Sequence, residues 1–291
     1  LRSWPKTRLS SPPKWLLQLM FKIHPKLRSR VNAAHEAVQS RRWLQDLAEW
    51  DELKKDSIAR NTALQSIELV KLDRPGLITH LDSCFKNAEE MVYRHHKYSV
   101  GSLMPVGRFL DVATLSTGLS AVDVAPLLKG STAVSKGIGG EQLIAVVKAI
   151  TAAGIVKNDL GEQKPETALN GLRENSQVNA ALESYLFITG HMLIGGYCIA
   201  EKTLRESPNI IMARILEAMK PANESGFDVA LEHTIRAKVP EQNRAEFDLC
   251  LADARSANRM RDERGIYNDI WGSGISRCAI LEAGRRLFGE G

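Results

Sequence analysis

The sequence predicts an all-α protein, a multi-helix domain that can divide into two helical subdomains. Along most of the chain, apolar residues recur three and four positions apart, which is the spacing of one face of an α-helix. The alternation typical of a half-buried strand is hard to find anywhere in the 291 residues. Groups of glycine, proline and aspartate separate the helical patterns and predict turns.

The first part of the chain combines a basic arm with a helical region. Residues 1–35 hold eight Lys or Arg and no acid, and a short apolar helix is expected at residues 15–21. Residues 31–70 follow a helical pattern in which Trp43 and Trp50 lie one heptad apart, so both are expected in the core.

A turn at residues 73–76 precedes the next predicted helix. Its apolar stripe should face the core and ends in a histidine. For that last residue two interpretations stay open, a neutral hydrogen-bonded core group and a functional group. The stripe consists of Ile78, Leu81, Phe85, Ala88, Val92 and His95.

The middle of the chain carries local start and stop signals. A helix around Phe109 should end at Gly118, and Ser120 with Asp123 predicts a capping box for a short helix ending at Gly130. The glycine-rich run at residues 136–140 lacks the Lys-Ser/Thr pair and the preceding strand of a phosphate-binding loop. It is interpreted as a flexible turn before a helix that begins near residue 141.

Domain boundaries are predicted from the longest polar break, at residues 154–175. This connection would join an N-terminal helical subdomain, residues 1–153, to a C-terminal one, residues 176–291. The second subdomain is expected to hold helices at 178–188, 209–220 and 240–262. Glu206, just before Pro208, is interpreted as an acid that stabilises a helix start.

The stretch from Leu251 to Leu287 carries seven arginines among aromatic residues and glycines. Helical spacing places Arg261 on the same inward face as Phe247, where a guanidinium needs an anionic partner. Glycines 265, 272 and 274 are expected to break the helix around Tyr267 and Trp271. A helix with an apolar stripe from Ile280 to Leu287 should follow. Two interpretations remain: an anion-binding corner, or an ion-paired helical hairpin with Glu282 and Arg286 as a surface pair.

Composition restricts the function classes. The four cysteines are widely spaced and predict neither a metal site nor a disulfide framework. The net charge of +5 is modest, and without aromatic base-stacking signatures nucleic-acid binding is not expected. No apolar run predicts a membrane span and no signal peptide is visible, so a cytoplasmic protein is expected. Because it starts at Leu1 rather than Met, the chain is expected to be a piece of a longer protein.

Three stretches carry a resemblance to a known family. They are RDERGIYNDIWGSGISRCAILEAGRRL, VGRFLDVATLSTGLSAVDVAPLLKGS at residues 106–131, and FITGHMLIGGYCIAEKTLRESP at residues 187–208. In this order they resemble the central helical domain of phosphoenolpyruvate-synthase-like enzymes, the group of rifampin phosphotransferase and the prodigiosin-type condensing enzymes. The chain departs from that pattern at Met192 and at Gly265, where relatives commonly have cations.

The resemblance implies a substrate-binding helical domain of an ATP-dependent phosphotransferase or condensing enzyme that acts on a small organic acceptor. ATP, Mg²⁺ and the carrier histidine would belong to ATP-grasp and phosphohistidine domains of the same chain, so this piece alone would be inactive, without a catalytic residue, cofactor or metal of its own. The expected substrate- or phosphate-binding residues are Arg261, Arg264, Tyr267, Trp271, Arg277, His95 and His191.

Two other function classes were compared with this one. A non-catalytic all-α interaction module would use the basic arm and Trp43, Trp50 and Trp271 as contact surfaces. A terpene-synthase-like enzyme is disfavoured because the sequence has no aspartate-rich motif to bind magnesium.

Overall fold

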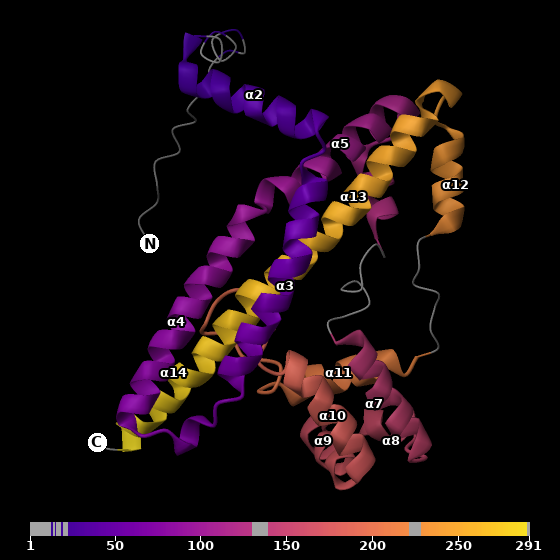
Figure 1. Ribbon diagram of the computed structural model, residues 1–291. Helices are drawn as coiled ribbons and strands as arrows, with labels where there is room; N and C mark the ends of the chain where they lie inside the picture. Colours follow the sequence, from indigo (N-terminus) through magenta and orange to yellow (C-terminus); the bar gives the residue numbers. More distant parts are fainter. Residues whose placement is uncertain are drawn as a thin grey trace. The chain divides into compact units, whose positions relative to one another are not determined.

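A computed structural model describes residues 23–129, 139–220 and 228–289, together with residues 13, 15 and 19 (Figure 1). The chain divides into two compact units, Leu1–Gln45 and Asp46–Gly291. In the first unit, α2 (Pro25–Gln39) begins with a proline in its first turn and buries no residue. The candidate site described below lies entirely in the second unit.

The predicted all-α fold is confirmed over the described ranges, which contain helices and no named strand, only an isolated bridge between Leu193 and Thr203. The remaining elements are α3 (Trp43–Gln65), η1 (Leu69–Lys71), α4 (Arg74–Lys97), α5 (Ser99–Thr117), α6 (Ala121–Val124), η2 (Ala125–Leu128), α7 (Gly140–Ala152), α8 (Lys157–Glu162), α9 (Pro165–Glu174), α10 (Ser176–Thr189), α11 (Pro208–Ala218), α12 (Val229–Ala237), η4 (Glu241–Asn243), α13 (Arg244–Arg264), η5 (Gly265–Ile270) and α14 (Trp271–Gly289).

Local signals set several helix ends as predicted. Asp73 caps α4 by accepting from the backbone N–H of Gly76. Gly118 ends α5 in the left-handed conformation, with φ of 72°. Ser120 and Asp123 form both bonds of the predicted capping box of α6. Residue 130, the predicted end of that short helix, and residues 136–138 lie outside the described residues.

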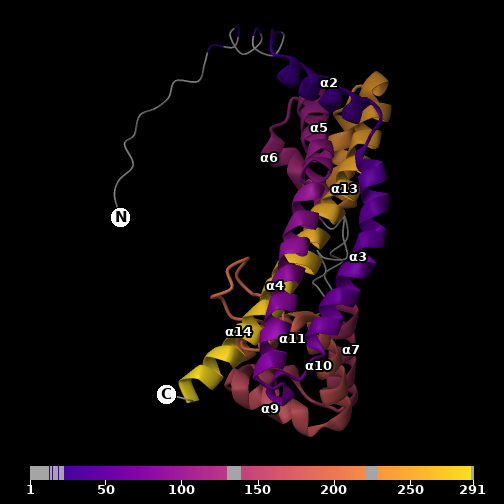
Figure 2. The same cartoon turned by 60° about the vertical axis from the view of Figure 1, so that its left-hand side comes forward.

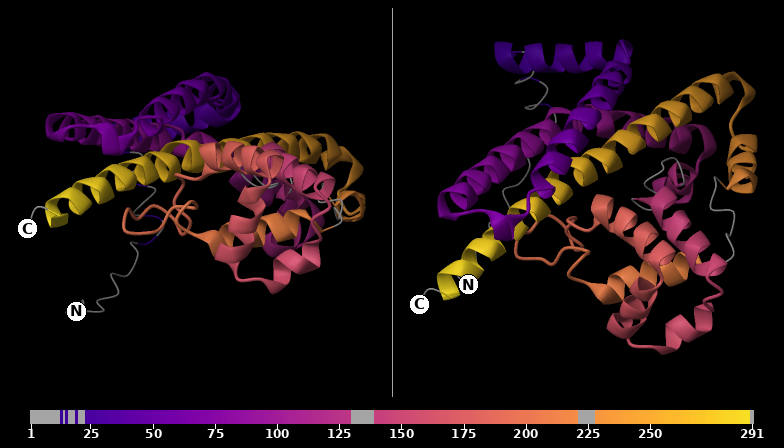
Figure 3. Two further views of the ribbon diagram at one scale, coloured as in Figure 1. Left: turned by 90° about the horizontal axis from the view of Figure 1, so that it is seen from below. Right: turned by 60° about the horizontal axis from the view of Figure 1, so that its bottom comes forward.

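The longest helical path is formed by α13, η5 and α14, which follow one another without a break (Figure 3). The expected helix break around Tyr267 and Trp271 is therefore wrong. Residues Gly265–Ile270 form a π-helical segment inside a continuous helix. The glycines serve close packing instead of a turn. A Cβ at Gly274 would overlap the carbonyl oxygen of His191, and one at Gly272 would lie 3.4 Å from Met91.

Separate apolar clusters hold the elements of the second unit together. One lies among α7–α11 and includes Tyr185 and Leu186. Another joins α5, α6, η2, α12 and α13, with Phe109 and Phe247 in an edge-to-face contact. A third packs α4 against η5 and α14, around Trp271 and Cys84. The site lies beside this third cluster.

The predicted stripe of α4 is wrong by one residue. Ile78, Phe85 and Val92 are exposed, while the neighbouring Leu77, Cys84 and Met91 are buried. Both stripes have helical spacing, and the buried one is interrupted by the polar residues His80, Asn87 and Arg94. The sequence pattern favoured the more apolar stripe, whereas packing against α14 buries the one that carries hydrogen-bonding groups. His95, at the edge between the two, is partly buried.

The apolar stripe predicted from Ile280 to Leu287 in the last helix is also wrong. Ile280 and Leu287 are exposed, and Glu282 is buried instead. The expected pair between Glu282 and Arg286 exists, at 2.8 Å, but it is no surface pair, because Arg286 also donates to the carbonyls of Leu69 and Leu72. These contacts tie α14 to the connection between α3 and α4.

The predicted polar connection at residues 154–175 contains helices α8 and α9. Their Leu160, Leu169 and Leu172 are buried in the cluster of α7–α11. The segment thus takes part in a core, and the division into subdomains at this point stays a prediction.

Replacing Gly274 with alanine should destabilise the protein, because the new methyl group has no room beside the His191 carbonyl. We expect a loss of roughly 1–3 kcal/mol in the free energy of unfolding, measured with urea. Gly284, in the same helix, has open space around it. Its alanine variant is the control and should gain up to about 1 kcal/mol through helix propensity. Equal effects of the two changes would contradict the close packing at residue 274.

Replacing Arg286 with methionine should cost about 1–3 kcal/mol in urea unfolding, because two carbonyl acceptors lose their donor. Arg285 is the matched control, since it pairs with the same carboxylate from an exposed position. Its methionine variant should change stability by less than about 1 kcal/mol. A cost for the Arg285 variant as large as that for Arg286 would argue against the two carbonyl contacts.

Candidate functional site

The π-helical segment Gly265–Ile270 is the centre of the candidate site. Short π-helical segments are rare and occur frequently at functional sites, because they turn side chains and carbonyls out of the regular helical pattern. Here the carbonyl of Tyr267 accepts from Asn61 Nδ2 at 2.8 Å, and that of Ile270 accepts from the backbone N–H of Leu193. The segment places Asn268 and Asp269 inside the protein.

Arg264, the last residue of α13, is buried with only 4% of its surface exposed. Its Nη1 donates to the carbonyl of His95 and, at 3.0 Å, to Ser99 Oγ, so it joins α13 to the end of α4 and the start of α5. Burial lowers the pKa of this guanidinium, and the nearby carboxylate of Asp269 opposes that shift. A guanidinium nevertheless stays charged in a protein, so Arg264 brings a buried positive charge to the site.

His95 meets Asp269 directly. Its Nδ1 lies 2.6 Å from Asp269 Oδ2, but the approach is not aligned for a hydrogen bond. Burial, with the charges of Arg264 and His96, lowers the pKa of His95 to about 4. Burial raises the pKa of Asp269 to about 7, against the opposing effect of Arg264. At neutral pH the imidazole is therefore uncharged, and the carboxyl group is close to its titration midpoint.

Unsatisfied polar atoms gather at this place. Among buried atoms without a hydrogen-bond partner are Arg264 Nε, Asp269 Oδ1 and both polar atoms of the Asn268 side chain. Such groups are rare in folded proteins, because each costs about 1–3 kcal/mol. Their concentration around one π-helical segment indicates a site that is completed by water or by a polar ligand.

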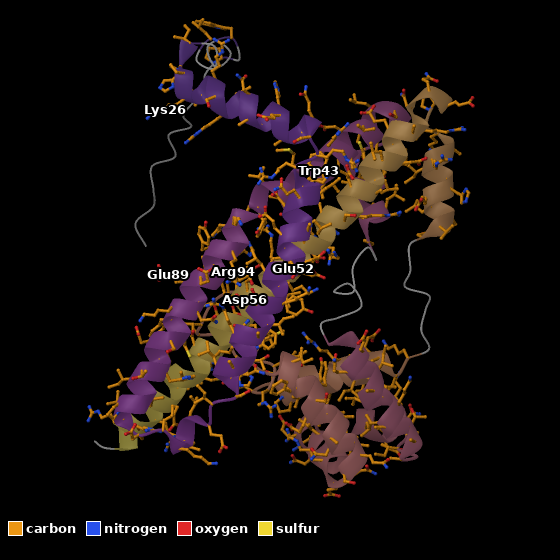
Figure 4. All side chains as sticks on the ribbon, in the orientation of Figure 1. Lys26, Trp43, Glu52, Asp56, Glu89 and Arg94 are labelled. Carbon is orange, nitrogen blue, oxygen red and sulfur yellow. The ribbon has the colours of Figure 1, made fainter. Side chains whose placement is uncertain are left out.

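A second polar network holds the α3 side of this region. Glu263, also buried, accepts from Trp50 Nε1 at 2.9 Å and from Lys54 Nζ at 3.0 Å. Between α3 and α4, the buried Arg94 pairs with Asp56 at 2.7 Å (Figure 4). These contacts are satisfied ion pairs, and we assign them to the scaffold that positions α4.

The loop of residues 190–207, between α10 and α11, lies on the other side of the site (Figure 2). Arg277 of α14 anchors the loop by a bidentate ion pair with Glu206 and by a hydrogen bond that it donates to the carbonyl of Ile199. The ring of Tyr197 lies 6.3 Å from the ring of His95, edge-on. A Cβ at Gly265 would come within 3.2 Å of the Tyr197 hydroxyl, so this glycine makes room for the tyrosine.

Arg261 is not part of the site, and its predicted inward position is wrong. Its side chain is 45% exposed and pairs with the adjacent Asp262. The face of α13 that begins at Phe247 is buried up to Asn258. Beyond Asn258 the packing partner of α13 changes from α5 to Trp50 and Tyr98. The inward face accordingly continues through Met260 and Arg264.

Of the other predicted residues, Tyr267 and Trp271 are packed against each other beside the site, and Trp271 Nε1 donates to Gln65. Trp43, Trp50 and Trp271 are all buried, so the expectation that they offer contact surfaces is wrong. Arg277 binds the 190–207 loop through Glu206, which is not the cap of α11. His191 lies in the same loop; burial lowers its pKa to about 4, so it is neutral, and its Nδ1 has no partner.

Asp269 and Asn268 were missed by sequence reasoning. A regular helix advances about 100° per residue, and a π-helical segment shifts the downstream register by about one residue. Periodicity carried through the segment therefore cannot identify the inward residues beyond it. The only available signal is composition, since the Asn-Asp pair interrupts an otherwise apolar and aromatic run.

Comparisons with known proteins found no match to the sequence, either among family models or among curated proteins. Over the described residues, no group of His, Cys, Asp or Glu side chains is arranged to hold a metal ion. No described helix combines the length and apolarity that crossing a membrane requires.

The raised pKa of Asp269 predicts a pH-dependent stability. Its folded-state pKa of about 7 exceeds the ordinary value of 3.8 for an aspartate, so the folded protein binds an extra proton between these pH values. The stabilising contribution is present at low pH and is lost as pH rises toward 7. Asp269→Asn removes this titration, so the stability of the variant relative to the parent should rise by about 1 kcal/mol or more from pH 4 to pH 8.

Urea unfolding at several pH values measures this difference. Asp262→Asn is the control, because it removes a carboxylate of the same chain region that pairs with Arg261 and does not face His95. A constant difference between the Asp269 variant and the parent would mean that burial does not raise this pKa.

Proposed function

We propose that this chain is the substrate-binding helical domain of a phosphoenolpyruvate-synthase-like, ATP-dependent phosphotransferase or condensing enzyme. The proposal rests on the resemblance of three ordered sequence stretches and on one structural observation. That observation is Arg264, a buried guanidinium with an unpaired Nε beside the π-helical segment. A fixed cation in a water-poor place is what a transferring phosphoryl group or a carboxylate requires.

In this proposal the cation at the reacting group is Arg264, in place of Arg261. The chain lacks the second cation of the family at Gly265, and the structure gives that position to the Tyr197 hydroxyl. The acceptor is a small organic molecule. ATP and Mg²⁺ would be bound by an ATP-grasp domain, and a phosphohistidine domain would carry the phosphoryl group, both in the same protein.

The flanking sequence is the first test, because the proposal requires ATP-grasp and phosphohistidine segments in the full reading frame. The isolated chain should neither hydrolyse ATP nor retain label from radioactive ATP or phosphoenolpyruvate, while the full-length protein should do both. Stable label on His95 or His191 of the isolated chain would assign the carrier role to this domain and overturn the proposal.

Turnover of the full-length enzyme tests Arg264 itself. Arg264→Lys keeps the charge but loses the fork of donors, and should lower phosphoryl transfer by about a hundredfold. Arg261→Met is the matched control from the same helix end and should leave turnover within about threefold. Thermal unfolding of both variants verifies that they fold. Equal turnover of the two folded variants would contradict the proposal that Arg264 binds the anionic group.

A second candidate function is an interaction module without catalysis, and one observation favours it. Ile78, Phe85 and Val92 form an exposed apolar stripe along α4 at heptad spacing. Serine substitutions at Phe85 and Val92 would weaken binding of a partner under this hypothesis. A reading frame without ATP-grasp and phosphohistidine segments would decide in its favour.

A further inference from the structure

We propose that His95 is the proton acceptor for a hydroxyl group of the acceptor substrate, and that Asp269 is the residue that positions its imidazole. The inference rests on the proposed function and narrows the acceptor to a hydroxyl-bearing compound with an anionic group, or one that becomes anionic, beside Arg264. The resemblance assigns no catalytic residue to this part of the chain.

The geometry that carries this inference is a histidine with a carboxyl group on one ring nitrogen only. Asp269 Oδ2 lies 2.6 Å from Nδ1. Because the two ring nitrogens point apart, Nε2 faces away from the carboxyl group. When Asp269 is ionised and aligned with Nδ1, the carboxylate favours a proton on that nitrogen and leaves Nε2 as the basic one. The contact is close but unaligned, and such contacts between catalytic groups commonly align only when substrate binds.

The surroundings keep this imidazole uncharged before reaction. Four titratable or charged groups face it: Asp269 from η5, Arg264 from α13, His96 from its own helix and Tyr197 from the 190–207 loop. Arg264 also donates to the backbone carbonyl of His95, so the base and the cation are held at a fixed separation. The neutral imidazole is free to accept a proton, and an anionic substrate group beside Arg264 would offset the positive charge that lowers the basicity of His95.

The 190–207 loop contacts this pair through Tyr197, whose ring packs edge-on against His95. Residues Ile194, Tyr197 and Ile199 are exposed apolar side chains, on a loop whose ends are fixed to α14 through Arg277 and to η5 through Leu193. Gly195 and Gly196 lie within it, and Gly196 has φ of 152°. In the proposal these exposed apolar side chains contact the carbon skeleton of the substrate.

The chemical step balances as follows. The substrate hydroxyl oxygen forms a bond to phosphorus, and the bond between phosphorus and the carrier histidine of the other domain breaks, with its electron pair remaining on that nitrogen. The hydroxyl proton moves to Nε2 of His95. Asp269 stabilises the imidazolium that forms, and the proton is then released to solvent or to the carrier imidazole.

Nitrogen-15 NMR of the histidine side chains tests the pair without any assay of activity. At pH 7 the His95 ring should be the Nδ1–H tautomer and should titrate well below pH 6. Asp269→Asn should change that tautomer distribution, whereas Asp262→Asn should leave it unchanged. An Nε2–H tautomer in the parent protein would overturn the inference, because the basic nitrogen would then face Asp269.

Kinetics of the full-length enzyme separate a base from a structural residue. His95→Gln should lower kcat for a hydroxyl acceptor by at least about a hundredfold, and Asp269→Asn by at least about tenfold with little change in KM. Imidazole added to a His95→Gly variant should restore part of the activity. His233→Gln, at an exposed position of α12 away from this pair, is the control and should keep kcat within about threefold.

Failures of the two proposals are distinguishable. Phosphoryl transfer with unchanged kcat in the His95 and Asp269 variants overturns the roles proposed for these two residues. It does not contradict the proposed function. Absence of any phosphoryl transfer by the parent full-length protein overturns the proposed function, and with it the role of His95 in that reaction.

Discussion

The burial of ionisable groups along the path from α13 to α14 is the constraint on which the second unit depends. Glu263, Arg264 and Asp269 fall within seven consecutive residues, and each is at most 9% exposed. Removing a charge from water costs several kcal/mol unless partners compensate. Glu263 has such partners in Trp50 and Lys54, whereas Arg264 and Asp269 retain unsatisfied atoms. The first network stabilises the fold, and the second is a cost that the rest of the fold must offset.

The apolar clusters explain how that cost is tolerated. Trp271, Met192 and Ile275 pack directly after the π-helical segment, and Met260 packs with Trp50 and Tyr98 directly before it. Burying each such side chain contributes roughly 1.5–3 kcal/mol. The segment is therefore flanked by apolar packing on both sides, and this packing offsets the cost of its buried polar groups. Strained or unsatisfied groups that survive in this way are frequently functional.

Sequence reasoning predicted the fold class and much of the local structure, because these depend on short-range chemistry. The caps at Asp73 and Ser120 and the stop at Gly118 follow from side-chain and backbone geometry within four residues. One of its errors arose in α4, where a helix has two adjacent apolar stripes. In α4 the stripe with Ile78 is more apolar than the one with Leu77, His80 and Asn87. The second is nevertheless buried, because it packs against α14 and because α3 supplies hydrogen-bonding partners such as Asn61, which accepts from Asn87.

Two of the expected site residues, His95 and Arg264, lie in the candidate site. The family resemblance, together with residue types, selected His95 and Arg264, and the structure joins them through the bond from the guanidinium to the His95 carbonyl. Arg261 was preferred on periodicity, but periodicity assumes one constant partner along a helix, and α13 changes partner between Asn258 and Met260. Asp269 could not be placed, since the π-helical segment shifts the register before it. A buried acid that faces a histidine across two helices is a tertiary property, and only the packing of α4 against η5 creates it.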